Sequence, residues 1–258
     1  MGIKTKGTKE WVDKTYGIYK GCENNCGYCY AKSIALYGGW CPSEGWDKPI
    51  FNERAFNQSV SKYYERGVMC FTSHDITPNN LEKCIEFILR IIKESENQIL
   101  IVSKPNFICI KKLCEVLKPY RDRIEFRFTI TSKGDSIAVE WEKEAPLIDE
   151  RLLCLEYVFN RNWKVSVSIE PFLDRNPVWL IEIIYRFCDS IWLGIMSNRK
   201  YKWHTKENLI YVMEEIKWLP DKIRKKLHLK DSLSNLLNKY EINNGLEEMK
   251  NLPFGINF

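Results

Sequence analysis

The chain has 258 residues, of which 45% are hydrophobic and 28% charged. These proportions are typical of a folded globular protein and exclude long disordered, collagen-like and low-complexity classes. The formal net charge of +5 permits an anionic ligand but does not demand a nucleic-acid polymer. No apolar run reaches the roughly 18 to 20 residues that cross a bilayer, and the N-terminus lacks the apolar stretch of a signal peptide. We therefore expect a cytoplasmic protein without a membrane partner.

The chain contains ten cysteines, which we expect to be reduced thiols or metal ligands, because thiols outside the export route stay reduced. Seven are scattered, mostly inside apolar runs, where a cysteine behaves as a small buried hydrophobic residue. The other three, Cys22, Cys26 and Cys29, form a Cys-x3-Cys-x2-Cys cluster with Gly, Asn and Tyr between them. Such clustering brings no gain in hydrophobic burial. Three thiolates this close in sequence can converge on one metal centre.

Two kinds of metal centre fit this spacing. A tetrahedral zinc needs a fourth ligand, which is normally supplied by a second Cys or His pair, and no such pair follows, although Cys41 could complete the site. An iron-sulfur cubane held by three cysteines leaves one iron open to an exogenous chelator. The residues alone leave both interpretations open.

The rest of the chain alternates between strand and helix patterns, which predicts a mainly parallel sheet. The predicted strands span residues 15–19, 67–72, 98–103, 124–131, 163–169 and 190–195. The predicted helices after them span residues 31–37, 79–93, 110–117, 149–160 and 177–187, with a long loop over 135–148. Six strand-helix units by about residue 200 predict an α/β fold, specifically a partial (β/α)6 TIM-like barrel.

The last part of the chain, residues 201–258, is predicted to be a Lys-rich helical extension. Its helices are expected over 207–218 and 223–240, separated by a break at Pro220. The extension caps the open side of the barrel in one interpretation and is a packing appendage with a solvated charged face in the other. We expect one barrel domain over 1–200 followed by this extension.

Polar residues follow most of the predicted strands. In parallel barrels the catalytic groups lie at the carboxyl ends of the strands, so these side chains are expected to meet at one end of the barrel. They are Ser73, His74, Asp75, Lys104, Thr131, Ser132, Glu170, Ser197 and Asn198. The alternative for each is a helix cap or turn residue, since Ser, Asp and Asn commonly begin helices.

The cysteine cluster, which precedes a helix-compatible segment, resembles the signature of the radical S-adenosylmethionine superfamily. The resemblance implies that Cys22, Cys26 and Cys29 hold a 4Fe-4S cluster, whose open iron is chelated by S-adenosylmethionine. It also implies an external electron donor, such as flavodoxin or ferredoxin, and a 5'-deoxyadenosyl radical that abstracts hydrogen from an unactivated carbon. The strand ends would then bind the cofactor. The candidates are Tyr28, Ser73, His74, Asp75, Lys104, Thr131, Ser132, Glu170 and Asn198.

The chain departs from the commonest superfamily pattern, because Thr72-Ser73-His74-Asp75 stands where Gly-Gly-Glu is usual. This segment with Pro78, together with 102–104, 129–132 and 144–146 followed by Arg151, looks like the corresponding positions of the spore photoproduct lyase branch. The resemblance covers roughly residues 15–200. Members of that branch use a thiol as hydrogen donor, which makes Cys41 a candidate catalytic residue.

The loop over residues 38–46 is the candidate substrate site. It carries Trp40, Trp46 and the carboxylate of Glu44. Tryptophan faces can stack on a heterocycle, and a carboxylate can accept hydrogen bonds from the N-H and amino edge of a guanine-type base. Glu44 is therefore a candidate for both catalysis and binding, and Asp231 is a second such carboxylate. Alternatively, the tryptophans cover the side of the barrel and Glu44 is solvated.

In overall appearance the chain also resembles the queuosine lyases. This resemblance implies that a nucleoside or nucleotide is the substrate, and that the base queuine is released from queuosine or its 5'-phosphate after hydrogen abstraction from the ribose. Three alternatives stay open: repair of thymine photoproducts in DNA, another radical S-adenosylmethionine reaction, and a zinc-stabilised RNA-binding protein. The repair enzyme would need a stronger basic groove than the net charge suggests, so no DNA polymer is expected as partner. The zinc protein would use Cys22, Cys26, Cys29 and Cys41.

Overall fold

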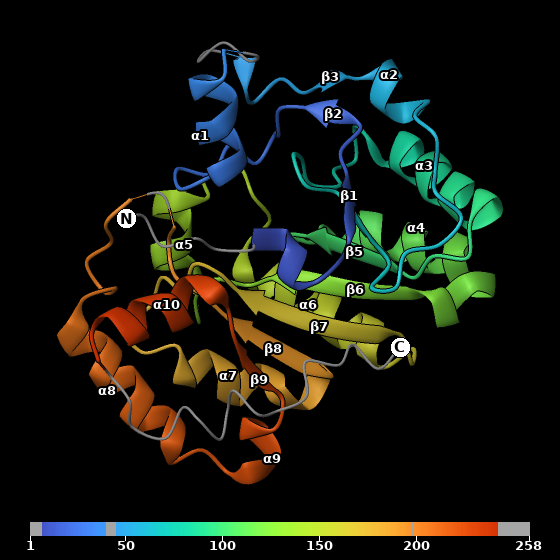
Figure 1. The fold of residues 1–258 in the computed structure, drawn as a ribbon. Helices are drawn as coiled ribbons and strands as arrows, with labels where there is room; N and C mark the ends of the chain where they lie inside the picture. Colours follow the sequence, from blue (N-terminus) through green and yellow to red (C-terminus); the bar gives the residue numbers. More distant parts are fainter. Residues whose placement is uncertain (1–6, 40–44, 198, 242–258) are drawn as a thin grey trace.

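The computed structural model describes residues 7–39, 45–197 and 199–241 (Figure 1). Its centre is a seven-stranded sheet in the order β1-β4-β5-β6-β7-β8-β9, and every neighbouring pair is parallel. The strands are β1 (Lys14–Tyr16), β4 (Val68–Cys70), β5 (Ile99–Ser103), β6 (Ile124–Thr129), β7 (Lys164–Ile169), β8 (Ser190–Leu193) and β9 (Leu227–Leu229). A separate antiparallel pair joins β2 (Tyr19–Lys20) to β3 (Ile50–Phe51).

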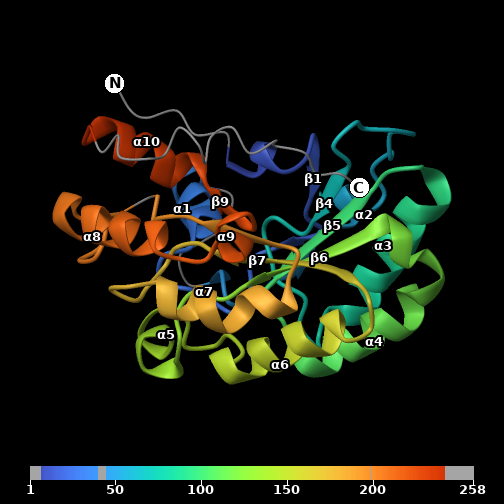
Figure 2. The ribbon, with the colours of Figure 1, turned by 90° about the horizontal axis from the view of Figure 1, so that it is seen from below.

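Helices connect the strands, and Figure 2 shows α3, α4, α6 and α7 along one side of the sheet. The α-helices are α1 (Tyr30–Tyr37), α2 (Glu53–Phe56), α3 (Leu81–Glu94), α4 (Phe107–Leu117), α5 (Asp135–Trp141), α6 (Ile148–Phe159), α7 (Val178–Ile184), α8 (Lys206–Lys217), α9 (Asp221–Arg224) and α10 (Asp231–Lys239). The 3-10 segments are η1 (Gly7–Glu10), η3 (Lys118–Arg123) and η4 (Tyr185–Phe187).

The apolar pattern of the sequence explains these elements. In α3, the residues Leu81, Cys84, Ile85, Ile88 and Ile92 recur at helical spacing, and all are buried against the sheet. The central strands are buried on both faces, as expected for a parallel sheet covered by helices. Because strand-to-strand crossovers place all carboxyl ends at one edge, the loops after the strands meet there.

The predicted α/β class and the parallel sheet are confirmed, and each of the six predicted strands has a counterpart in the sheet. The described strands form an open sheet with β1 and β9 at its edges. The closer description as a partial barrel remains a prediction.

Two elements differ from the prediction. The loop expected over 135–148 contains α5, and the helix expected over 223–240 is interrupted by β9. β9 forms because the edge of β8 offers unpaired backbone groups: the Ile191 amide donates to the Lys226 carbonyl at 2.7 Å, and the Lys230 amide donates to the Leu193 carbonyl at 2.9 Å. These bonds and the burial of Leu227 outweigh the helical propensity of the segment. Part of the extension therefore belongs to the sheet.

Among the described residues, none of the helices combines the length and apolarity that a bilayer crossing requires.

Candidate functional site

The three clustered cysteines lie on the loop between β2 and α1, residues 21–29, which we call the cysteine loop. It begins at Gly21, whose φ is +102° and where an added Cβ would lie 2.6 Å from the carbonyl oxygen of Trp46. Only glycine fits such a position. The Cys22 amide donates to the same Trp46 oxygen at 2.7 Å, which fixes the loop's start. At the loop's end the Cys29 thiol caps α1 by accepting from the Lys32 amide at 3.4 Å.

The thiols of the cysteine loop are sheltered from solvent, with Cys22 8% and Cys26 6% exposed. Burial raises the pKa of all three thiols, that of Cys26 to about 12, so they are protonated at neutral pH. Cys29 packs against both apolar clusters that contain the other two cysteines. Within the described residues, no three His, Cys, Asp or Glu side chains are arranged to hold a metal ion. The donor set fits a three-cysteine cluster in number and chemistry, and binding it would require the loop to adjust and the thiols to release their protons.

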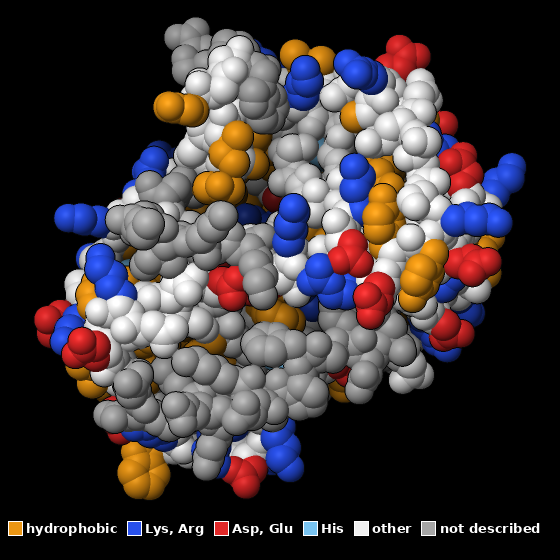
Figure 3. All heavy atoms as spheres, viewed as in Figure 1, with side chains coloured by type: hydrophobic (Ala, Val, Ile, Leu, Met, Phe, Trp, Pro, Cys, Tyr) orange, Lys and Arg blue, Asp and Glu red, His pale blue; other side chains and the backbone are white. Residues whose placement is uncertain are grey.

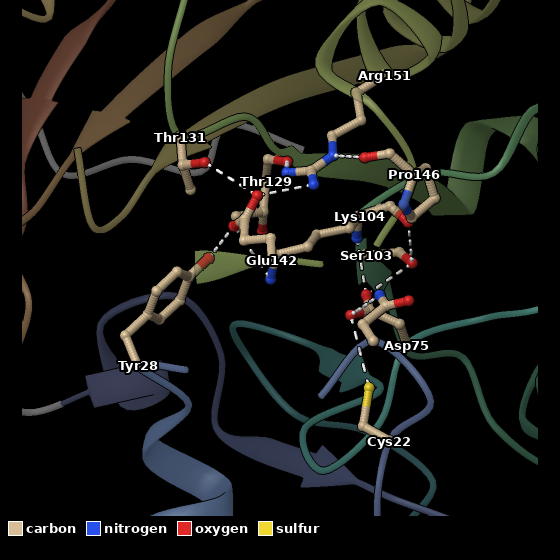
Figure 4. Close-up of polar contacts among 11 residues, drawn as sticks. Cys22, Tyr28, Asp75, Ser103, Lys104, Thr129, Thr131, Glu142, Pro146 and Arg151 are labelled. Carbon is tan, nitrogen blue, oxygen red and sulfur yellow. Dashed lines mark hydrogen bonds and ion pairs between the residues drawn. The ribbon is translucent and has the colours of Figure 1, made fainter. Parts of the chain in front are cut away.

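Asp75 ties the cysteine loop to the carboxyl end of the sheet (Figure 4). Its Oδ2 accepts from Asn24 Nδ2 at 2.8 Å and lies 3.9 Å from the Cys22 sulfur. Its Oδ1 accepts from the Ser103 hydroxyl at 2.8 Å and from the Lys104 amide at 2.7 Å. One carboxylate thus joins the loop before α1 to the end of β5.

A second carboxylate, Glu142, lies at the centre of a buried polar group with a fully buried side chain (Figure 4). Its Oε2 pairs with Arg151 at 2.7 Å and accepts from the Thr131 hydroxyl at 3.2 Å. Its Oε1 accepts from the Tyr28 hydroxyl and lies 3.9 Å from Lys104 Nζ. Arg151 is in turn fixed by the Pro146 carbonyl, to which its Nε donates at 2.7 Å. Such a network holds its members in one geometry.

Lys104 follows β5 and directs its ammonium toward Glu142 and over the Tyr28 ring, whose centroid is 5.5 Å away. Burial alone would lower the pKa of Lys104, but the surrounding acidic groups, which include the carboxylates of Glu142 and Asp75, raise it well above its usual value. Lys104 is therefore a permanent cation next to the cysteine loop. Burial, reinforced by the adjacent Glu142, likewise raises the pKa of Tyr28, which stays protonated.

The other candidates after β4 are engaged with backbone. His74 is 5% exposed, and its Nε2 accepts from the Ile18 amide at 3.2 Å. Its Nδ1 then carries the proton and donates to the Asp75 carbonyl at 3.0 Å. Burial lowers the pKa of His74 to about 4, so the ring is neutral. The Ser73 hydroxyl donates to the Tyr19 carbonyl at 2.8 Å. Both side chains hold β1 and β2 in place in this structure.

Of the candidates after β6 and β7, one joins the Glu142 network, one bonds to backbone, and one contacts the C-terminal extension. Thr131 joins the Glu142 network, whereas the Ser132 hydroxyl donates to the Gly134 carbonyl at 2.8 Å. Glu170 accepts from the Ser232 hydroxyl at 3.0 Å and lies 3.5 Å from Lys230, which also lies 3.5 Å from Glu10. The predicted site residue Asp231 begins α10 next to these groups.

The candidate substrate residues are only partly covered by the structure. Trp46 is 1% exposed and packs with Cys22 and Ala35 behind the cysteine loop. The remaining candidates, Trp40, Cys41, Glu44 and Asn198, lie outside the described residues. Their roles, and that of Trp46 as a stacking surface, stay predictions.

The surface beside the cysteine loop is apolar. Helix α1 exposes Tyr30, Ile34 and Tyr37, which recur at helical spacing and are 61%, 45% and 98% exposed. Figure 3 shows hydrophobic side chains gathered on the surface in the region of α1. Large exposed apolar patches commonly mark sites of interaction.

Sequence reasoning missed Glu142, Ser103 and Asn24. Glu142 lies in the segment predicted as a loop, eleven positions after Thr131, and nothing in the residue pattern distinguishes it from the solvated acids Glu140 and Glu144. One argument could have pointed to Glu142: an arginine that is buried, as Arg151 is, needs a carboxylate partner.

The comparisons with known proteins concern fold. No protein-family model matches the chain, and no curated protein matches it. Among solved structures, the chain is similar to Streptococcus suis SuiB bound to the precursor peptide SuiA, with a TM-score of 0.54, 14% identity, and coverage of 97% of this chain and 57% of SuiB. Two further SuiB structures match less well. SuiB alone gives a TM-score of 0.49 at 13% identity, covering 91% of this chain and 51% of SuiB. SuiB bound to S-adenosylmethionine gives 0.46 at 14% identity, covering 84% and 45%.

This chain therefore spans about half the length of the SuiB chains. At 14% identity the similarity shows a shared type of fold. That fold is a mixed α/β architecture with a parallel sheet.

Proposed function

We propose that the chain is a radical S-adenosylmethionine enzyme in which Cys22, Cys26 and Cys29 hold a 4Fe-4S cluster. The observation that carries the proposal is the position of the cysteine loop, which lies at the carboxyl edge of a parallel sheet and opens directly into α1. The fold shared with SuiB supports it, and SuiB has also been solved with S-adenosylmethionine.

When bound, the cluster and S-adenosylmethionine supply an electron and a primary carbon radical that abstracts hydrogen. The side chains of the protein position the cysteine loop and set the charge and water content around it. Asp75 positions the cysteine loop against β5 through its bonds to Asn24 and the Lys104 amide. The Lys104 ammonium provides a fixed positive charge beside the thiols, which favours their ionised form and an anionic group such as the methionyl carboxylate. The buried Glu142 network closes this region to water.

The exposed apolar residues of α1 lie on the helix that Cys29 caps, and Tyr30 directly follows this cysteine. We propose that an external donor such as flavodoxin or ferredoxin reduces the cluster from this side.

For the reaction itself we propose a lyase that releases queuine from queuosine or its 5'-phosphate. The support is the overall resemblance of the chain to the queuosine lyases and the guanine-reading capacity of Glu44 and Asp231, whereas the strand ends 72–75, 102–104 and 129–132 resemble the wider spore photoproduct lyase branch. A second candidate is modification of a peptide, which the similarity to SuiB bound to SuiA favours. DNA photoproduct repair is a third outcome of the same assay.

The test is anaerobic reconstitution with iron and sulfide, followed by reduction and incubation with S-adenosylmethionine. Brown protein with visible absorbance is expected, and Cys26→Ala should remove the colour while Cys114→Ala retains it. A colourless protein that holds one zinc would overturn the superfamily assignment in favour of the zinc-stabilised protein.

Substrate is then assigned by mass spectrometry with queuosine, its 5'-phosphate, a dithymine photoproduct and the precursor peptide SuiA. Free queuine together with substrate-dependent 5'-deoxyadenosine supports the lyase. A modified peptide or a repaired dinucleotide, with queuosine untouched, would replace it.

A further inference from the structure

The segment over residues 7–12, which we call the N-terminal strap, crosses the face of the sheet opposite the connecting helices. It consists of η1 followed by Trp11 and Val12, and both of these side chains are buried. They pack against apolar side chains of β4, β5 and β8, namely Met69, Leu100 and Trp192. In Figure 2 the strap is the blue segment before β1, and it lies on the other side of the sheet from α4, α6 and α7. The strap therefore covers this face of the sheet.

The strap continues into the sheet at residue 13, which is its hinge. The Asp13 amide donates to the Gly67 carbonyl at 3.3 Å, and the Asp13 carboxylate pairs with Arg66 at 2.6 Å. Arg66 also donates to the Lys9 carbonyl at 2.7 Å. Because Arg66 is exposed, water competes for its contacts.

The body of the strap is held by one buried cation, Lys230, which follows β9 and has a side chain that is 3% exposed. Its ammonium donates to the Gly7 carbonyl at 3.3 Å, lies 3.5 Å from Glu10, and lies 3.8 Å from the centroid of the Trp11 ring. The same ammonium lies 3.5 Å from Glu170, which follows β7. Lys230 is therefore a latch that joins the strap to a strand end at the carboxyl edge of the sheet.

Four polar atoms where the strap meets the sheet are buried without a hydrogen bond to any residue that the structure describes. They are Glu10 Oε1, Trp11 Nε1, Arg127 Nη1 and Trp192 Nε1. The Arg127 guanidinium lies 4.6 Å from the centroid of the Trp11 ring, and the centroid of the Trp192 ring lies 5.8 Å from it. Each unpaired atom costs free energy while the strap is closed, and water recovers that cost when the strap opens. The closed strap is therefore held less firmly than the central strands.

Glu10 carries a buried charge at this contact. Its side chain is 8% exposed, and its Oε2 accepts from the Asp231 amide at 3.2 Å. The ionisable groups that face it come from the elements packed against the strap: Lys230 after β9, Asp231 on α10, Glu170 after β7 and Arg127 on β6. Arg127 is already paired with Glu125 at 2.9 Å. Besides Lys230, Glu10 thus faces two further carboxylates.

Burial raises the pKa of Glu10, and the charges of Asp231 and Glu170 act in the same direction, against the lowering effects of Lys230 and the Asp231 amide. When the strap opens, the carboxylate is hydrated and its pKa returns toward the ordinary value. The closed strap therefore binds a proton more readily than the open strap, and closure becomes more favourable as the pH falls.

We infer that the N-terminal strap is a pH-sensitive cover, which opens about residue 13 while the sheet stays folded and which closes more firmly at acidic than at neutral pH. Because its latch also contacts Glu170, opening changes the surroundings of a predicted site residue. The inference uses neither the thiols nor a cofactor, so it does not depend on the proposed enzymatic activity.

The test is hydrogen exchange of the whole, unreconstituted chain, followed by mass spectrometry at pH 5.5 and 7.5 and corrected for intrinsic exchange rates. The Trp11 and Val12 amides report closure, because they donate to the Thr8 carbonyl at 3.0 and 3.2 Å, and the amides over 126–128 in β6 report global unfolding. We expect the strap to be less protected than β6 at both pH values. Its protection factor should be about threefold or more higher at pH 5.5 than at pH 7.5. Equal protection of the two segments would overturn the inference, since the strap would then open only when the whole chain unfolds.

Variants identify the groups responsible. Glu10→Gln keeps the size of the side chain without the charge, so the strap should be more protected at pH 7.5 and its pH dependence should disappear. Glu65→Gln is the matched control, since Glu65 is an exposed carboxylate outside the strap and its replacement should leave the wild-type behaviour. Adding Lys230→Met to Glu10→Gln should lower strap protection about tenfold relative to Glu10→Gln alone, because the latch is lost. Wild-type pH dependence in a folded Glu10→Gln variant, or unchanged protection in the folded double variant, would contradict the inference.

Discussion

Asp75 accepts a hydrogen bond from the backbone amide of Lys104 at 2.7 Å, and this contact fixes the cysteine loop relative to the sheet. The same carboxylate holds Asn24 and Ser103, so three donors converge on one side chain. A neutral amide cannot accept all three, because one of its two positions becomes a donor.

Asp75→Asn is therefore expected to lower the free energy of unfolding by about 1–3 kcal/mol, since it breaks charge-assisted hydrogen bonds at a partly buried site. Chemical denaturation measures the change. Glu23→Gln on the same loop is the control, because the Glu23 carboxylate is only partly buried and, among the residues that the structure describes, accepts only from the exposed Asn79; it should shift stability by less than about 0.5 kcal/mol. Equal effects of the two variants would show that the Asp75 contacts do not anchor the loop.

Cys29 has two separable roles, as helix cap and as proposed cluster ligand. Serine is a good N-cap residue, so Cys29→Ser should keep α1 intact and leave the stability of the iron-free protein within about 0.5 kcal/mol of wild type. The same variant should lose the iron and the visible absorbance after reconstitution. Full iron content in Cys29→Ser would remove this residue from the ligand set.

Glu142→Gln should destabilise the protein by about 3–5 kcal/mol, because it leaves Arg151 buried without a counter-charge. Denaturant unfolding of Glu142→Gln, of Arg151→Met and of the double variant Glu142→Gln/Arg151→Met tests this cause. The double variant removes both charges and should recover part of the loss. If the double variant loses more free energy of unfolding than the two single variants lose together, the unpaired charge of Arg151 is not the cause of the destabilisation.

The neutral state of His74 makes stability depend on pH. Its pKa is lowered to about 4 in the folded chain, against 6.5 for an ordinary histidine, so the unfolded chain binds the proton first as the pH falls. The free energy of unfolding should therefore decrease from pH 6.5 to about 4, by up to about 1.4 kcal/mol per pH unit from this one group.

Parallel denaturation curves of wild type and His74→Gln measure this contribution. The variant should be less stable at pH 7, where it lacks the ring stacked on Phe71. The gap between the two proteins should narrow toward pH 4.5. A constant gap would mean that His74 does not titrate between these limits.

The strands and their order of appearance follow from the sequence, because the run over 98–103 is apolar on both faces and can only be buried in a covered sheet, and the run over 163–169 alternates polar and apolar residues at the spacing of a strand. For the same reason, the positions of Asp75 and Lys104 at the carboxyl edge were predictable. β9 was not, since three residues embedded in a helical pattern become a strand only when a neighbouring edge is available.

The roles of individual side chains were harder to predict than their positions. Ser73 and His74 lie where a cofactor site was expected, yet their polar atoms satisfy backbone groups of Tyr19 and Ile18. A sequence does not reveal which of several polar residues at a strand end will be used by the chain itself, because that depends on the path of segments far away in sequence.

The position of β9 also affects how the protein is made. Lys230 directly follows this strand and reaches the Gly7 carbonyl at 3.3 Å, while the Asp231 amide donates to Glu10 at 3.2 Å, contacts that span 223 and 221 positions. Closing loops of that length is entropically costly and slow, so these contacts form late. A growing chain therefore cannot complete its sheet until synthesis has passed residue 231, and until then the β8 edge and the carboxylate of Glu170 remain open to other partners.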